Sequence, residues 1–267
     1  MKRRWLFWSA VTYLGLLGIL ATFGPTFRYD FLKPSPTPFE GFSATHWFGT
    51  DDLGRDVFAR LAYGARMSLL VGICVQALAL LIGISVGLVG SFGPKTLRQP
   101  ILRLTDAMFA FPDILLAILI IGLWGRGLFP VIAALAVTSW PAVARLVVTQ
   151  SASLKEREYV TATLAMGASM GYTVVRHVLP HLWRIVLSVS MIDMAGNILA
   201  ESALSFLGIG IQSPYPSWGS MIKVARDNLE SQPIMLLWPC LILSVTIFAL
   251  NIVGDGLSAR LDPKQRS

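Results

Sequence analysis

Charged residues are scarce in this chain of 267 residues: they make up 14% of it, against about 25% in an average soluble domain. Hydrophobic residues make up 54%, and the mean hydropathy is +0.64. A chain with so few charged residues and so many hydrophobic ones has too few polar side chains to form a water-exposed surface. The composition therefore excludes a soluble globular protein and predicts an integral membrane protein.

Cysteine and nucleotide-binding patterns are also rare or missing. The only two cysteines, Cys74 and Cys240, lie inside apolar runs, where we expect small buried hydrophobic residues and no disulfide. The phosphate-binding pattern GxxxxGK[ST] and the metal patterns HExxH and CxxC do not occur. We therefore expect no metal site, no cofactor, no ATP-binding site within the chain and no enzyme activity.

Long apolar runs predict an all-α membrane protein with six transmembrane helices. The first run exceeds the apolar core of a signal peptide, so we expect it to be retained as a span. Before the second run, a polar segment predicts an amphipathic helix capped by Thr50 or Asp51. The six expected spans are 5–23, 67–92, 104–124, 128–148, 185–207 and 235–253.

The distribution of basic residues predicts the orientation. With the N-terminus in the cytoplasm, inner segments hold 14 of the 22 Lys and Arg residues and outer segments hold eight. This positive-inside bias predicts cytoplasmic termini and explains the net charge of +7 without nucleic-acid binding. The predicted units are a first span with an extracytoplasmic segment carrying the amphipathic helix (1–66), a five-span core (67–254) containing a cytoplasmic loop (151–184), and a cytoplasmic tail (255–267).

The cytoplasmic loop at 151–184 has the pattern of two short helices joined by a turn. Gly167 suits the left-handed residue that ends a helix, Ser169 can cap a second helix, and Pro180 is expected to end that helix. An apolar stripe at helical spacing runs along the first helix and consists of Tyr159, Ala162 and Met166. The stripe fits docking into a groove of a partner protein, and it fits equally a loop folded onto its own bundle.

Polar residues interrupt the fifth span at intervals of four and so share one helix face. They are Asp193, Asn197, Glu201 and Ser205. Asp113, in the third span, is likewise expected to face protein or water instead of lipid. Such a stripe lines a translocation pathway or holds the bundle together through hydrogen bonds between helices, and the pattern does not separate these two interpretations.

Four stretches, in this order, resemble the inner-membrane permease subunits of ABC importers of the dipeptide, oligopeptide and nickel class. They are GTDDLGRD at 49–56, RLTDAMFAFPDILL at 103–116, REYVTATLAMGAS at 157–169 and ILAESALSFLGIGIQSPYPSWGSMI at 198–222. The first is similar to the family signature in Gly49, Thr50, Asp51, Gly54, Arg55 and Asp56. The third resembles the cytoplasmic EAA loop, although Thr161 and Thr163 replace its glutamate and second alanine.

The resemblance implies a bundle like that of a type I ABC importer permease, forming half of a pathway for peptides, nickel or metal complexes across the bacterial inner membrane. It implies a coupling helix that contacts an ATPase through Glu158, Tyr159, Val160, Thr161, Ala162, Met166, Gly167, Ala168 and Ser169. The expected partners are a second homologous permease, two ABC ATPase subunits that hydrolyse ATP, an extracytoplasmic solute-binding protein and membrane lipid.

Two other classes of function compete with this interpretation. An ion-coupled secondary transporter would use Asp113, Asp193 and Glu201 as proton or sodium sites, but the two halves of the chain show no inverted repeat. A membrane-embedded enzyme would pair Asp193 with Glu201. Eight residues span about 12 Å along a helix, which exceeds the ~5–9.5 Å between cooperating carboxylates.

Overall fold

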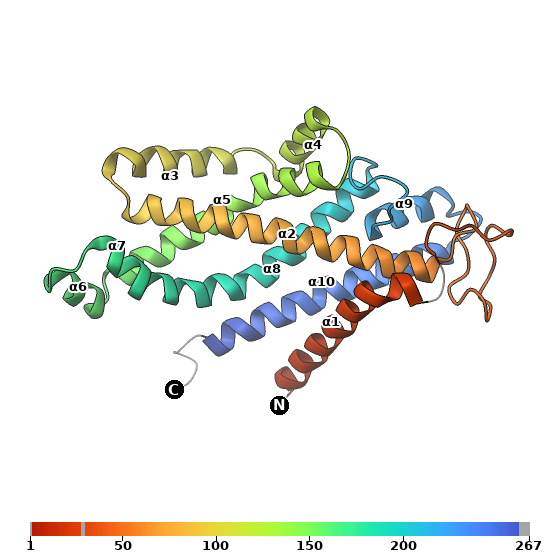
Figure 1. The fold of residues 1–267 in the computed structure, drawn as a ribbon, viewed down its shortest axis with the longest axis horizontal. Helices are drawn as coiled ribbons and strands as arrows, with labels where there is room; N and C mark the ends of the chain where they lie inside the picture. Colours follow the sequence, from red (N-terminus) through yellow and green to blue (C-terminus); the bar gives the residue numbers. More distant parts are fainter. Residues whose placement is uncertain (1, 28–29, 262–267) are drawn as a thin grey trace.

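The computed structural model describes residues 2–27 and 30–261, and every regular element within those ranges is helical (Figure 1). Five helices are long and apolar enough to cross a membrane. A sixth crossing exists if the bent pair of α3 and α4 counts as one span. The predicted all-α class is confirmed, and residues 2–27 and 30–261 contain five or six candidate membrane spans.

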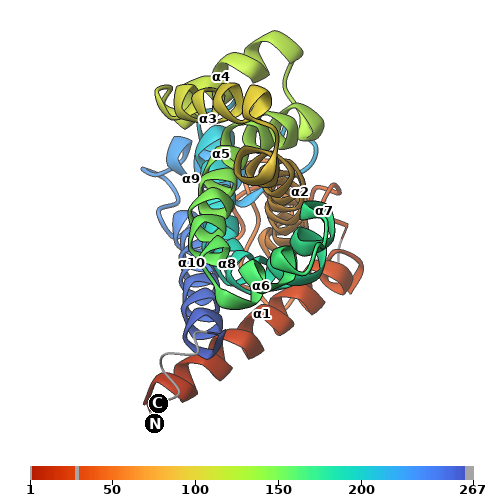
Figure 2. The same ribbon diagram turned by 90° about the vertical axis from the view of Figure 1, so that its left-hand side faces the viewer.

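A central core of α2, α5 and α8 runs along the elongated molecule. Figure 2 shows α3 and α4 on one side of this core and α1 on the opposite side. In Figure 1, α6 and α7 lie at one end of the molecule, and α9 lies at the other end with the segment that precedes α2. The helices are α1 (Lys2–Phe27), α2 (Val57–Phe92), α3 (Lys95–Phe109), α4 (Asp113–Trp124), α5 (Leu128–Lys155), α6 (Glu158–Ala165), α7 (Met170–Thr173), a π-helix (Val174–Val178), α8 (Leu179–Phe206), α9 (Trp218–Asp227) and α10 (Ile234–Leu261).

The expected amphipathic helix and the second span are one continuous helix, α2, so the prediction of two separate elements is wrong. Asp56 caps this helix, in place of Thr50 or Asp51: its Oδ1 accepts a hydrogen bond from Ala59 N at 2.7 Å. No proline interrupts the helix, and its first turns bury their apolar face against α1 and α9. The polar start of α2 is thus an extension of the span.

Glycines allow α2 and α5 to approach each other closely. A Cβ at Gly83 would lie 2.5 Å from Val143 Cβ, and one at Gly87 would lie 2.7 Å from Val147 Cβ. The same stretch, 83–87, matches the GxSxG pattern of hydrolase nucleophile elbows. That elbow needs a strand-to-helix turn, whereas these residues lie within a continuous helix, where they serve packing.

The third span, expected at 104–124, is broken. Helix α3 ends at Phe109, α4 begins at Asp113, and the two helix axes differ by 94°. Pro112 lies at the N-cap of α4; proline lacks a backbone N–H and disfavours helix in the residue before it, so the chain turns here. Asp113 therefore lies exposed in the first turn of α4, directly after the bend between the two helices.

The fifth span begins earlier than the sequence predicts. Pro180 was expected to end a helix, but it lies in the first turn of α8, directly after the π-helix Val174–Val178. As a result, helical backbone runs from Met170 to Phe206. At the other end of the molecule, the loop expected at 208–234 contains helix α9, whose first turn is closed by a capping box between Ser217 and Ser220.

Candidate functional site

The GTDDLGRD stretch folds into a tight turn that fixes the start of α2. Asp51 is almost fully buried, and its Oδ1 accepts hydrogen bonds from Leu53 N at 3.0 Å and Arg55 N at 2.8 Å. Its Oδ2 lies 2.7 Å from Arg55 Nε and 3.2 Å from Arg60 Nε. Because one carboxylate joins the turn to both arginines, this part of the signature has a structural task.

The remaining signature residues complete the same turn. Gly49 and Gly54 both have φ of +75°, and a Cβ on either would lie 2.4 Å from a backbone carbonyl oxygen. Thr50 Oγ1 donates to Thr37 O at 2.9 Å, and Asp56 Oδ2 lies 2.8 Å from His46 Nδ1. The six signature residues therefore hold one another and adjacent backbone in place.

The segment predicted to be a coupling helix is α6, and its C-terminus ends as the sequence predicts. Gly167 has φ of +86°, and its N–H donates to Leu164 O at 3.0 Å. Ala168 N donates to Thr163 O at 3.3 Å. These two bonds form a Schellman motif. Ser169 Oγ then accepts from Tyr172 N at 3.3 Å and caps α7, as predicted.

The predicted apolar stripe of α6 faces outward. Tyr159 and Ala162 are exposed, and Met166 is 81% exposed. The opposite face packs on the bundle: Val160 lies in a core cluster with Val178 and residues of α5 and α8. One face of α6 thus folds onto its own bundle while the stripe stays uncovered, so each of the two open interpretations describes one face.

The two threonines at the EAA positions bond to their own helix. Thr161 Oγ1 donates to Glu158 O at 2.9 Å, and Thr163 Oγ1 donates to Tyr159 O at 2.6 Å. Thr163 is buried, whereas Glu158 and Thr161 are exposed beside the stripe. The exposed carboxylate of this segment is therefore in the first turn of α6.

The polar stripe of α8 divides into two parts with different surroundings. Glu201 is fully buried: its Oε1 accepts from Ser205 Oγ at 2.7 Å, and its Oε2 accepts from Ser68 Oγ of α2 at 3.3 Å. Ser205 Oγ also accepts from Ile211 N at 3.1 Å. This half of the stripe holds α8 to α2 and to the chain that follows α8.

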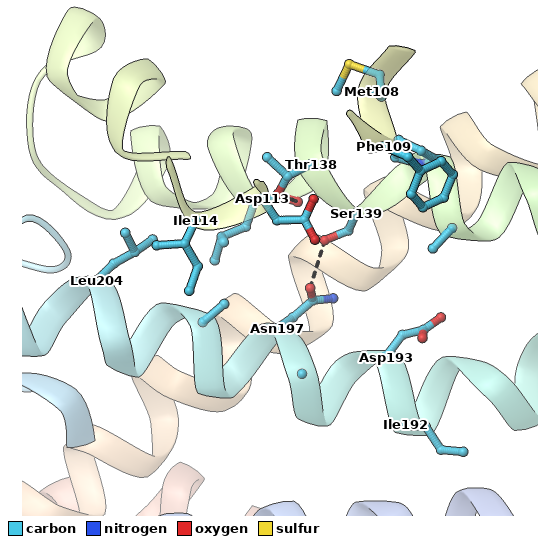
Figure 3. A pocket seen from close by; sticks show the side chains of 15 residues that line it. Met108, Phe109, Asp113, Ile114, Thr138, Ser139, Ile192, Asp193, Asn197 and Leu204 are labelled. Carbon is cyan, nitrogen blue, oxygen red and sulfur yellow. Dashed lines mark hydrogen bonds between the residues drawn. The ribbon is translucent and has the colours of Figure 1, made fainter. Parts of the chain in front are cut away.

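The other half of the stripe lines a cavity of about 330 Å³ between α4, α5 and α8, to which the end of α3 also contributes. Figure 3 shows Asp113 and Asp193 approaching this cavity from facing helices, with Asn197 between them. Asn197 Oδ1 accepts from Ser139 Oγ at 2.8 Å, and Asn197 Nδ2 donates to Gln76 Oε1 at 2.9 Å. Three of the five predicted pathway residues therefore meet, and Glu201 and Ser205 lie elsewhere.

Ser139 and Gln76 were missed by the sequence analysis. Gln76 is a single polar residue inside an apolar run, Ser139 stands beside Thr138 in another such run, and neither repeats at helical spacing. The only signal is that uncharged polar side chains in membrane helices tend to bond across helices. Within residues 2–27 and 30–261, no group of three or more His, Cys, Asp or Glu side chains is placed to hold a metal ion.

Comparisons with known proteins extend these observations. Residues 79–267 match the family described as binding-protein-dependent transport system inner membrane component. The chain is 37% identical over 257 residues to the dipeptide transport system permease protein DppC of Alkalihalophilus pseudofirmus, covering 96% of this chain and 84% of the relative. It is also 37% identical to the oligopeptide transport system permease protein OppC of Bacillus subtilis, over 94% of this chain and 83% of the relative.

Solved structures show the same architecture at low sequence identity. A chain of the MetNI methionine ABC transporter, in an inward-facing conformation, superposes with a TM-score of 0.62 at 17% identity. The match covers 74% of this chain and 94% of that chain. At this level of identity the likeness concerns the fold alone.

Proposed function

The chain belongs to the family of binding-protein-dependent transport system inner membrane components, and from this premise we propose that it is the permease subunit of an ATP-driven ABC importer for peptides. It is a multi-pass inner-membrane protein whose curated relatives are named as transport permeases. One chain would form half of the translocation pathway. The names of these relatives favour peptides over the nickel or metal complexes that the resemblance also implies.

The observation that carries this proposal is the uncovered stripe on α6. Tyr159, Ala162 and Met166 project from a short helix whose Val160 lies in a core cluster with residues of α5 and α8. An apolar helix face that is not covered by its own chain suits a groove in another protein. A force applied to this helix would pass through Val160 and Val178 into α8, whose middle lines the cavity. An ion-coupled transporter has no need of such a surface.

The proposed assembly follows from this arrangement. Two ABC ATPase subunits would bind and hydrolyse ATP, one of them docking on residues 158–169. A second homologous permease would supply the other half of the pathway. A solute-binding protein would meet the opposite end of the molecule, where α9 and the segment before α2 lie (Figure 1).

The test is transport by the complete assembly in proteoliposomes. Met166→Glu, combined with Tyr159→Ala, changes exposed side chains and leaves the Val160 anchor in place. We expect peptide-stimulated ATP hydrolysis and ATP-driven uptake to fall at least about tenfold, because a charge is introduced into an apolar contact. The matched control is Leu97→Ala, which truncates an exposed apolar residue on α3.

Two results would contradict the proposal. One is full ATP-coupled uptake by the Met166→Glu, Tyr159→Ala double variant. The other is uptake by this chain that needs an ion gradient and no ATP, which would favour the ion-coupled secondary transporter with Asp113 and Asp193 as ion sites.

A further inference from the structure

The cavity between α4, α5 and α8 holds two carboxylates and no basic side chain. Asp113 belongs to the first turn of α4, and Asp193 belongs to α8. In the described ranges, 2–27 and 30–261, neither carboxylate is within ion-pair distance of a Lys, Arg or His side chain. Negative charge inside a membrane bundle needs a compensating cation or water. An incoming positive group could therefore compensate the negative charge of this cavity.

A second, independent feature lies next to the acids. Gln76 of α2 is 5% exposed, and its Oε1 is occupied by the bond from Asn197. Its Nε2 carries two N–H groups: the Asp193 carboxyl lies close enough to accept from one, and the other finds no partner within the described part of the chain. A buried N–H donor without an acceptor is unfavourable, by about 1–3 kcal/mol. This donor would be satisfied by a carbonyl oxygen that arrives with the ligand.

The other cavity walls restrict what can enter. Asn197 and Ser139 already bond to each other and to Gln76, so their hydrogen-bonding groups are largely used within the protein. The remaining walls are mainly apolar, from Met108, Ile114, Leu135 and Leu204 among others. A volume of about 330 Å³ falls within the range of small-ligand pockets. The ligand must therefore join a cationic group to an apolar part.

We infer that this cavity binds the amino-terminal end of a peptide during its passage, with the ammonium group between Asp113 and Asp193, the first carbonyl oxygen toward Gln76 Nε2 and the side chain against the apolar wall. The inference rests on the proposed transport function and names the chemical group that the pathway recognises.

A free divalent cation is a poorer match for the same residues. Hard cations take about six or more oxygen ligands, and the cavity offers two carboxylates with an amide oxygen that is already bonded. A divalent cation would also leave the second Gln76 N–H without an acceptor, because a cation accepts no hydrogen bond. An ammonium followed by a carbonyl satisfies both the acids and the amide.

The experiment uses the complete assembly without its solute-binding protein, so that selection by that protein does not enter. Ala142 is exposed and lines the cavity, so Ala142→Cys gives a thiol whose reaction with a small methanethiosulfonate reagent reports occupancy. Reaction of Cys74 and Cys240 is measured in the same assembly without Ala142→Cys and subtracted. The probes are dialanine, N-acetyl-dialanine and Mn²⁺ alone.

We expect dialanine to slow the labelling of the thiol introduced by Ala142→Cys at concentrations at which N-acetyl-dialanine, which lacks the ammonium, has no effect. Asp113→Asn and Asp193→Asn should each raise the concentration of dialanine needed for half-protection about tenfold or more. Asp255→Asn removes the same charge on α10, outside the cavity, and should leave protection unchanged.

Equal protection by both dipeptides, or protection by Mn²⁺ alone, would overturn the inference. ATP-driven uptake with the binding protein restored is measured on the same preparations. If uptake proceeds while dialanine gives no protection, the ammonium site is wrong and the transport function stands. If uptake does not depend on ATP in any preparation, the proposed function itself fails.

Discussion

Trp218 Nε1 donates a hydrogen bond to the carbonyl oxygen of Leu61 at 3.3 Å, so the start of α9 is joined to the first turns of α2 across 157 residues of sequence. The indole is fully buried in a cluster that also contains Leu17 of α1 and Leu250 of α10. This cluster draws residues from α1, α2, α8, α9 and α10, and Figure 1 shows α9 at the end of the molecule opposite α6. Helix α8 belongs to this cluster and also lines the cavity, so the cluster helps to fix one wall of the cavity.

Replacement of Trp218 tests this junction. We expect Trp218→Ala to lower the free energy of unfolding by about 3–5 kcal/mol, since it leaves a large cavity within this cluster. Trp218→Phe keeps most of the buried area and loses the N–H donor, so a reduction of about 1 kcal/mol is expected. Thermal unfolding in detergent measures both changes.

Trp124→Ala, at a side chain that is 59% exposed, is the control. An equally small effect of Trp218→Ala and Trp124→Ala would show that the junction does not stabilise the bundle.

The glycines of the signature turn give a second prediction. Gly49→Ala and Gly54→Ala each combine a left-handed backbone with a Cβ 2.4 Å from a carbonyl oxygen. The left-handed conformation alone disfavours a non-glycine residue by roughly 1–2 kcal/mol, and the contact adds to this. We expect both variants to unfold at lower temperature and to be cut faster by protease between residues 30 and 56. Gly41→Ala, where a Cβ meets nothing within 4 Å, should behave like the wild type. Wild-type behaviour of Gly49→Ala would contradict the tight turn.

Local rules predicted those features whose cause is local. The end of α6 at Gly167 and the cap at Ser169 depend on a few neighbouring residues, and both were predicted correctly. Proline shows the limit of such rules. Pro112 and Pro180 are both candidate helix breakers, yet the first lies at the break between α3 and α4 and the second lies in the first turn of α8. Whether the chain turns or continues as a helix at each proline depends on how the following segment packs against the rest of the bundle, and the sequence pattern does not contain that information.

The same limit explains the divided stripe on α8. Asp193, Asn197, Glu201 and Ser205 have identical spacing, so the sequence assigns them one face and one role. Ser68 of α2, 133 positions before Glu201, determines that Glu201 is buried and bonded. The break at Pro112 brings Asp113 to the other half of the stripe. Both causes are contacts between distant segments, and helical periodicity does not predict them.

Gly167 provides a prediction about coupling. A Cβ at this position meets nothing within 4 Å, so Gly167→Ala adds only backbone strain, about 1–2 kcal/mol, at an exposed helix end. We expect the thermal unfolding temperature to change little, because the segment is peripheral. The turn after α6 should rearrange, and peptide-stimulated ATP hydrolysis should fall severalfold. Gly171→Ala has equally open space and no left-handed φ, and it is the matched control.

Gly167→Asn separates strain from side-chain size. Asparagine adopts the left-handed conformation more readily than alanine although it is larger. It should therefore retain more coupled hydrolysis than Gly167→Ala. If Gly167→Ala and Gly171→Ala hydrolyse ATP at the same peptide-stimulated rate, the shape of this turn is not needed for coupling.

Substitutions in the two halves of the α8 stripe should affect different properties: at Glu201 mainly the stability of the fold, and at Asp193 mainly transport. Glu201→Ala leaves the Ser68 and Ser205 hydroxyls without their buried acceptor and opens a void, so we expect a loss of about 2–4 kcal/mol in the free energy of unfolding. Asp193→Ala alters a half-buried side chain at the cavity, where stability should change by less than about 1 kcal/mol and uptake should fall. Glu201→Gln keeps the size and an acceptor oxygen, and should recover most of the stability. Unfolding in detergent and peptide uptake in proteoliposomes are measured on the same preparations. Should Glu201→Ala retain wild-type stability and lose uptake, Glu201 would belong to the pathway; should Asp193→Ala be as unstable as Glu201→Ala, the whole stripe would be structural.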